Sequence, residues 1–193
     1  MPVFGPTRAA LAAAAARGAD ILSPLRLVLT AEALTAPAPA LAVELNAELD
    51  ALCAAARELA ARRAGWLYFC PADAPLPAAL PRGLLQGTVL TFLRGVLRSG
   101  GQAVVRVVCQ GTGAVLVLQG GVPARMPGDL PALLHRCGAY VTAADGGQFA
   151  AAVRVPFSPA LPQREPPELA ALVLDRYSAV RVYLHGFCVE DVE

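Results

Sequence analysis

Apolar residues recur at alternating steps of four and three along the N-terminal part of the chain. The recurring positions are Leu11, Ala15, Gly18, Leu22, Leu25 and Leu29. This spacing is typical of a helix that packs lengthwise on other helices, and we expect one from about residue 6 to residue 35. Pro24 falls inside the pattern, where it removes the backbone bond to the carbonyl of Asp20 and predicts a kink at a fixed place.

A second helical pattern follows the breaker Ala36-Pro37-Ala38-Pro39 and runs from about residue 40 to residue 64. Its apolar stripe consists of Leu41, Leu45, Leu49, Leu52, Ala56 and Leu59. The two patterns predict an antiparallel helical hairpin over residues 1–64, which leaves much of its seam exposed. We therefore expect a homodimer in which two hairpins form a four-helix bundle. The expected dimer face consists of Leu22, Leu25, Leu29, Leu45, Leu49 and Leu52. The alternative is that the hairpin folds back on its own C-terminal domain.

The pattern changes after Gly65, where short β-branched and aromatic runs alternate with helical stretches. The expected elements are a strand at 66–70, a proline-punctuated loop at 71–81, a helix from about 84 to 97, strands at 103–109 and 114–119, a short helix at about 129–137, and strands at 140–144 and 149–156. Glycine-containing turns join the last two strand pairs as hairpins. This order predicts an α+β domain over residues 65–157, with one mainly antiparallel sheet and helices on one face.

Residues 158–193 form a tail that begins with a proline-rich connector. A short helix is expected at 168–176 and a strand at 179–189. The strand has two possible roles, which are to cover the edge of the sheet or to offer a docking strand to a partner. We favour edge protection.

Composition excludes several classes of function. The chain has 193 residues, of which 56% are hydrophobic, and its 16 basic and 15 acidic residues give a net charge of +1. This balance favours neither nucleic acid nor an anionic membrane as a partner. The five cysteines lack CxxC spacing and are interpreted as small apolar residues. No signal peptide and no apolar run of about 18 to 20 residues is present, so we expect a cytoplasmic protein without membrane spans.

Four stretches resemble sensor histidine kinases. Ala19-Asp20-Ile21-Leu22-Ser23-Pro24-Leu25 resembles the H box, whose usual form is His-Glu-Leu-Arg-Thr-Pro-Leu. Residues 86–98 resemble the N-box helix, 115–121 the strand entering the Asp-x-Gly-x-Gly box, and 146–156 the last hairpin. The resemblance covers about residues 8–157. It implies a dimerising helical hairpin followed by an α/β sandwich of the histidine-kinase ATPase type, the fold shared with the Hsp90 chaperone, DNA gyrase and MutL. The main alternative is an unrelated α+β domain.

The residues that carry the family's chemistry are replaced at the matching positions. Ala19 stands where the family has its phosphate-accepting histidine, and Gly95 where an asparagine binds magnesium. Gln119 replaces the aspartate that binds adenine, and Gly121 is kept but the next expected glycine is Pro123. The segment after Gly121 is too short for the usual ATP lid. The resemblance thus implies no catalytic residue, no metal site, and a vestigial nucleotide pocket at Gly95, Gln119 and Gly121.

The first functional hypothesis is a catalytically inactive, histidine-kinase-like protein of bacterial two-component signalling. It would act as a dimeric adaptor or regulator that docks a response regulator or a kinase, without a cofactor. The plan is similar to the phosphotransferase of the sporulation phosphorelay, which needs a hairpin histidine that this chain lacks. The alternative is an ATP-binding protein whose lidless pocket uses Gln119 and Gly121 and acts as an enzyme or nucleotide switch. A purely structural dimer is the third hypothesis.

Overall fold

The structure is a computed structural model that describes residues 13, 15, 16, 21–60, 66–121, 130–144 and 148–185. The predicted N-terminal helix lies outside the described residues over most of its first half. The helices are α2 (Leu22–Thr35), α3 (Leu45–Ala60), α4 (Arg82–Arg98), α5 (Leu130–Arg136), α6 (Leu169–Leu174) and α7 (Ala179–Tyr183). The strands are β1 (Leu41–Glu44), β2 (Trp66–Cys70), β3 (Pro77–Leu80), β4 (Gln102–Gln110), β5 (Gly113–Gly121), β6 (Tyr140–Ala144) and β7 (Gln148–Pro156).

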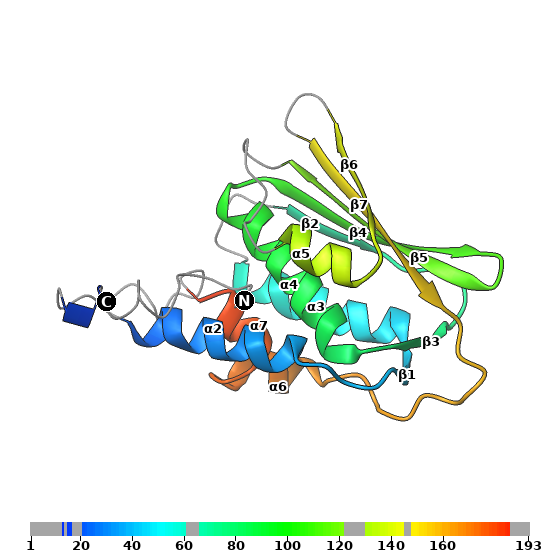
Figure 1. Ribbon diagram of the computed structural model, residues 1–193, viewed down its shortest axis with the longest axis horizontal. Helices are drawn as coiled ribbons and strands as arrows, with labels where there is room; N and C mark the ends of the chain where they lie inside the picture. The colour runs from blue at the N-terminus through cyan, green and yellow to red at the C-terminus, as the bar shows by residue number, and fades with distance from the viewer. Residues whose placement is uncertain are drawn as a thin grey trace.

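These elements form three layers (Figure 1). A five-stranded sheet has the order β2-β4-β5-β7-β6, and a small sheet pairs β1 with β3. In the large sheet β2 is parallel to β4, and the other neighbours are antiparallel. The helices α3, α4 and α5 lie against one face of this sheet, and α2, α6 and α7 lie beyond them. The predicted sheet, with helices on one face, is therefore confirmed.

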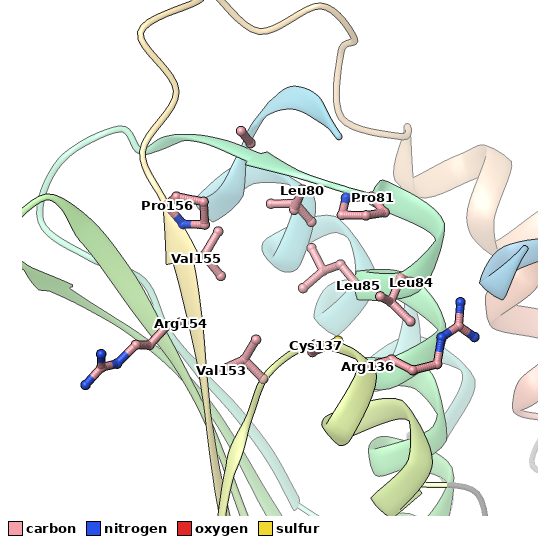
Figure 2. Close-up of a pocket in the computed structure, with 11 residues that line it drawn as sticks. Leu80, Pro81, Leu84, Leu85, Arg136, Cys137, Val153, Arg154, Val155 and Pro156 are labelled. Atoms are coloured by element: carbon pink, nitrogen blue, oxygen red, sulfur yellow. The ribbon is translucent and has the colours of Figure 1, made fainter. Parts of the chain in front are cut away.

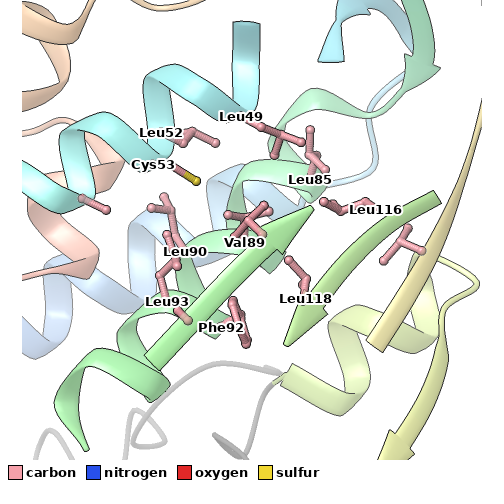
Figure 3. Close-up of a cluster of buried hydrophobic side chains, with 14 of the residues drawn as sticks. Leu49, Leu52, Cys53, Leu85, Val89, Leu90, Phe92, Leu93, Leu116 and Leu118 are labelled. Atoms are coloured by element: carbon pink, nitrogen blue, oxygen red, sulfur yellow. The ribbon is translucent and has the colours of Figure 1, made fainter. Parts of the chain in front are cut away.

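The core lies between the sheet and the first layer of helices (Figure 3). Leu49 and Leu52 of α3, Val89 of α4, and Leu116 and Leu118 of β5 belong to one buried cluster. Each of these side chains is fully buried. A buried leucine or valine stabilises the fold by about 1.5 to 3 kcal/mol relative to an exposed one. This cluster also includes side chains from α2, α6 and α7, so the described parts of the three predicted domains share one core.

The predicted helical hairpin is not confirmed by the described residues. The helix α2 packs on α4 and α7, whereas α3 packs on β2, α4, α6 and α7. Leu45, Leu49 and Leu52 are 0% exposed in the core of their own chain, so the prediction that they form a dimer face is wrong. An apolar stripe predicts that one face of a helix is buried, but it does not identify the partner that buries it. Here the partner of α3 is the rest of its own chain.

The residues from 41 to 44 were expected to begin the second helix but form β1. This strand pairs antiparallel with β3, with Leu41 opposite Leu80 and Glu44 opposite Pro77. The carboxylate of Glu44 then accepts hydrogen bonds from the backbone amides of Asn46 and Leu76. Capping by Glu44 explains why α3 begins at Leu45, and pairing with β1 explains why residues 77–80, predicted as loop, form β3.

The helix α2 approaches α4 closely because two glycines of α4 face it. A methyl group added to Gly83 would clash with the carbonyl oxygen of Leu34, and one added to Gly87 would lie 3.2 Å from Cγ2 of Thr35. The residues of α2 that are buried here are Val28, Ala31 and Thr35. The packed face therefore differs from the predicted seam, because α2 carries apolar residues on more than one side.

The predicted seam of α2 faces solvent over much of its length. Leu22 and Leu29 are 61% and 50% exposed, and Leu25 is half-buried. The helix begins at Leu22, so Pro24 lies in its first turn. Proline is tolerated there because the first amides of a helix have no intrahelical partner, and the expected mid-helix kink is not needed.

The tail forms two helices, and its predicted strand is wrong over residues 179–183. Ser178 caps α7, because its hydroxyl accepts a hydrogen bond from the amide of Arg181 at 3.2 Å. Val180, Val182 and Leu184 are buried, and α7 packs on α2, α3 and α4. The helices α6 and α7 of the tail thus cover other helices rather than an edge of the five-stranded sheet. The remainder of the predicted strand, residues 186–189, lies outside the described residues.

A buried ion pair ties α3 to α4 and to the connector. The carboxylate of Glu48, 1% exposed, accepts a hydrogen bond from Nε of Arg82 at 2.9 Å and contacts its Nη2 at 2.9 Å. Gln86 donates a further hydrogen bond to Glu48 at 2.6 Å. Arg82 also donates to the carbonyl oxygen of Glu165, so one guanidinium holds the connector against the helices.

Replacing Arg82 tests this arrangement. Arg82→Ala leaves the Glu48 carboxylate buried without its cation and is expected to lower the free energy of unfolding by about 3 kcal/mol. The control Arg98→Ala removes an exposed arginine from the same helix. It should change the free energy of unfolding by less than about 0.5 kcal/mol. Urea unfolding followed by circular dichroism measures both. A loss below about 1 kcal/mol for Arg82→Ala would mean that the pair behaves like an exposed one.

Candidate functional site

The positions that match the kinase chemistry fall into two groups. Ala19, at the phosphoacceptor position, lies outside the described residues, as does the segment 122–129 that contains Pro123 and stands in place of the lid. Gly95, Gln119 and Gly121 are described. Gly95 lies in the last part of α4, and the other two lie near the end of β5.

The end of α4 is seated directly on β5. Val96, the residue after Gly95, is 1% exposed. A methyl group added to Gly120 would lie 2.7 Å from Cγ2 of Val96 and 3.2 Å from the carbonyl oxygen of Gln102. A contact below 3.0 Å forces a neighbour to move, so no space for another group remains between Val96 and β5. The structure thus brings the Gly95 end of α4 to β5, and it does so in direct contact.

Gln119 points away from α4. Side chains alternate between the two faces of a strand, and Leu116 and Leu118 are buried on the face that meets the helices. Gly120 shares that face, whereas Gln119 is exposed on the opposite one. The predicted site therefore does not assemble around Gln119. Sequence reasoning missed Gly120, although the period of two through Leu116 and Leu118 was a signal for it.

Apolar side chains occupy the space between α4 and the neighbouring strands. The ring of Phe92 lies beside Leu118 (Figure 3) and has its centroid 6.2 Å from that of Phe149 on β7. The helix α5 lies against α4 and contributes three fully buried leucines. A polyphosphate would have to leave water for a surface packed with apolar side chains, which is strongly unfavourable. The described residues at this place do not fit ATP and magnesium, and we assign no phosphoryl-transfer step to them.

No metal centre is evident among the residues that the structure describes. No three histidine, cysteine, aspartate or glutamate side chains gather there in a way that could hold an ion. His135 and His185 are far apart in the sequence, and Nε2 of His185 lies 3.1 Å from Oγ of Ser23 at the start of α2. This contact joins the C-terminal turn to α2.

A separate apolar pocket of about 200 Å³ opens near the other end of α4 (Figure 2). It is lined by Ala79, Leu80, Pro81, Leu84, Leu85, Arg136, Cys137, Val153, Arg154, Val155 and Pro156. In the figure the guanidinium of Arg154 points away from the pocket, and Arg136 extends past Leu84 toward α2, where it donates a hydrogen bond to the carbonyl oxygen of Thr35. Sequence reasoning missed this pocket because β3, one of its walls, was predicted as loop.

The cysteine of this pocket is not poised for nucleophilic chemistry. Burial raises the pKa of the Cys137 thiol above its ordinary value, and this effect exceeds the opposing one of a 3.5 Å contact with the hydroxyl of Thr88. Burial also raises the pKa of Cys53 in the core to about 12. Both thiols therefore stay protonated at neutral pH. A reactive cysteine, in contrast, would be a thiolate at that pH.

Adding one methyl group to Gly120 tests whether α4 packs on β5 without a gap. Gly120→Ala places a carbon against Val96 and is expected to lower the free energy of unfolding by about 1 to 3 kcal/mol. Gly121→Ala is the matched control, because nothing lies within 4 Å of the added carbon, and its effect should stay within about 0.5 kcal/mol. Val96→Ala combined with Gly120→Ala should recover part of the loss. Equal stability of the two single variants in urea unfolding would contradict the contact.

Comparison with known proteins gives a fold rather than a sequence family. No family model and no curated protein sequence matches the chain. Among solved structures, it is similar to the histidine kinase AdeS of Acinetobacter baumannii, with a TM-score of 0.55, 7% identity, and coverage of 80% of this chain and 87% of that one. It is also similar to the catalytic domain of histidine kinase ThkA, with a TM-score of 0.53, 9% identity, and coverage of 63% and 98%.

These likenesses rest on shape, since fewer than one residue in ten is identical in either pair. They support the expected α/β sandwich. None of the helices in the described part of the chain has both the length and the apolar run needed to cross a membrane. By its likeness to these solved structures, the chain has the fold of a histidine kinase catalytic domain. The helices α2, α6 and α7 cover the helical side of this fold.

Proposed function

We propose that this protein is a catalytically inactive, histidine-kinase-like adaptor of two-component signalling. The observation that carries the proposal is the contact of Val96 with Gly120, which fills the space beside Gly95 in a fold like that of kinase catalytic domains. Phosphoryl transfer depends on positioning the phosphates and stabilising their charge. Gly95 offers no side-chain oxygen to magnesium, and Ala19 offers no nitrogen to a phosphoryl group.

The nucleotide-switch alternative has less support. It requires Gln119 to accept a hydrogen bond from adenine in the pocket beside α4. Gln119 is exposed on the other face of β5, and Gly120 is the residue that meets α4. No other described side chain of β5 brings a polar group to that place. We therefore keep the adaptor as the single proposal.

The exposed side of α2 is the surface that we propose for docking. Leu22, Arg26, Leu29 and Ala33 are exposed and follow one another at steps of four, three and four, so they form one stripe. The stripe presents three apolar residues and one arginine to solvent. In the resemblance this helix carries the H box, which a second kinase chain or a response regulator contacts. We propose that a second copy of this chain, or a response regulator or kinase, binds the same stripe.

Calorimetry with ATP tests the loss of nucleotide chemistry. No heat of binding is expected at millimolar ATP, with or without magnesium, because the space beside α4 is filled. The catalytic domain of an active histidine kinase, titrated under the same conditions, is the positive control. A saturable heat that depends on magnesium would contradict the proposal and favour the nucleotide switch.

Charge on the α2 stripe tests the docking surface. The double variant Leu22→Asp, Leu29→Asp places two carboxylates in the stripe and is expected to convert a dimer into a monomer in sedimentation velocity. Leu161→Asp is the matched control, since Leu161 is 87% exposed on the connector, and it should remain a dimer. An unmodified protein that sediments as a monomer, or a double variant that stays dimeric, would show that the stripe is not a dimer interface.

A further inference from the structure

The outer face of the large sheet carries a hollow of about 320 Å³ that is separate from α4 and from the proposed docking stripe. The described helices all lie on the opposite face of the sheet (Figure 1). The hollow is lined by Gln102, Val104, Gln119, Gly120, Gly121, Gln148, Phe149 and Ala150. Three of these residues are glutamines, and they come from β4, β5 and β7.

Strand register gathers the three amides around one glycine. Gln148 lies opposite Gly121 and Ala150 lies opposite Gln119. Gln102 belongs to the strand on the other side of β5, so about 10 Å separates its backbone from that of Gln148. A methyl group on Gly121 would meet nothing within 4 Å. The glycine therefore leaves an open space between the glutamine side chains.

The chemistry of this hollow is polar and uncharged. Each glutamine amide offers two N–H donors and a carbonyl acceptor. All three glutamines are exposed, and within the described part of the chain no hydrogen bond ties their side chains to another group. None of the lining residues carries a charge. A ligand that fits has hydroxyl or amide groups and neither phosphate nor carboxylate.

Two aromatic rings flank the hollow on the edge strand β2. Trp66 is paired with Gln102, and Tyr68 with Val104. Their rings are 61% and 52% exposed, nearly parallel at 9°, with centroids 6.5 Å apart. Exposed large aromatic rings beside convergent polar groups are typical of ligand sites rather than of ordinary surface. The rings offer flat apolar faces next to the amides.

We propose that this face binds a neutral saccharide. Sugar hydroxyl groups donate and accept hydrogen bonds, as glutamine amides do, and the C–H faces of a pyranose ring pack on exposed aromatic rings. The spread of the amides from β4 to β7, with Trp66 beyond Gln102, provides room for more than one sugar ring. Nucleotides and sugar phosphates fit poorly because no lining residue supplies a cation.

Trp66 is the only tryptophan in the chain, so its fluorescence reports directly on this site. The probes are maltose, cellobiose and N,N′-diacetylchitobiose at millimolar concentrations, with adenosine and glucose 6-phosphate as competing classes. At least one neutral disaccharide is expected to change Trp66 emission saturably. No change with any of the three, or tighter binding of adenosine or glucose 6-phosphate, would overturn the proposal.

Variants localise the binding. Gln119→Ala and Gln148→Ala each remove one amide and should weaken affinity by about three- to tenfold. Gln110→Ala is the matched control, because this glutamine lies at the far end of β4, eight residues and about 26 Å from Gln102. The affinity of the Gln110→Ala variant for the disaccharide should equal that of the unmodified protein. Trp66→Ala removes the fluorophore, so ligand-observed NMR measures its binding of the disaccharide. This variant should lose binding without a change in melting temperature. Equal losses in all four variants would overturn the proposal.

Discussion

The packing of α4 between two layers is the constraint on which the rest of the structure depends. Every residue from Gly87 to Leu93 is buried, so α4 is covered on all sides rather than along one stripe. Phe92 and Val96 face the sheet, while Gly83 and Gly87 receive α2. The ion pair of Glu48 and Arg82 fixes the start of α4 against α3. The helices on the side away from the sheet must match these positions, which explains why α7 of the tail packs there.

The same packing makes the described end of α4 a poor fit for a nucleotide. A kinase site needs a water-filled cleft beside the end of this helix, lined by groups that hold magnesium and phosphate. Here a valine sits on a glycine of β5, and two phenylalanines meet beside it. Dense apolar packing stabilises the sandwich but leaves no preorganised charges. The exposed features lie elsewhere, on the α2 stripe and on the outer face of the sheet.

Local patterns in the sequence predicted most of the elements but not where they pack. The glycine turn between β4 and β5 has Gly111 at a φ of 57°, and such turns set hairpins locally. The destination of α3 was missed because its leucine stripe fits a dimer and an internal core equally well. The helix α7 was missed because its valines favour a strand, and the Ser178 cap with burial against four helices overrides that propensity. Gln119 was assigned by motif, whereas strand alternation decides its direction.

The central claim is that the nucleotide scaffold persists while its pocket is filled. Amide and methyl NMR of the labelled protein, recorded during addition of ATP and magnesium, tests this claim at individual residues. We predict that the amides of Gly95, Gly120 and Gly121 and the methyl groups of Val96 keep their chemical shifts at millimolar nucleotide. Saturable shifts confined to these residues would show that α4 and β5 still enclose a nucleotide, and would contradict the account.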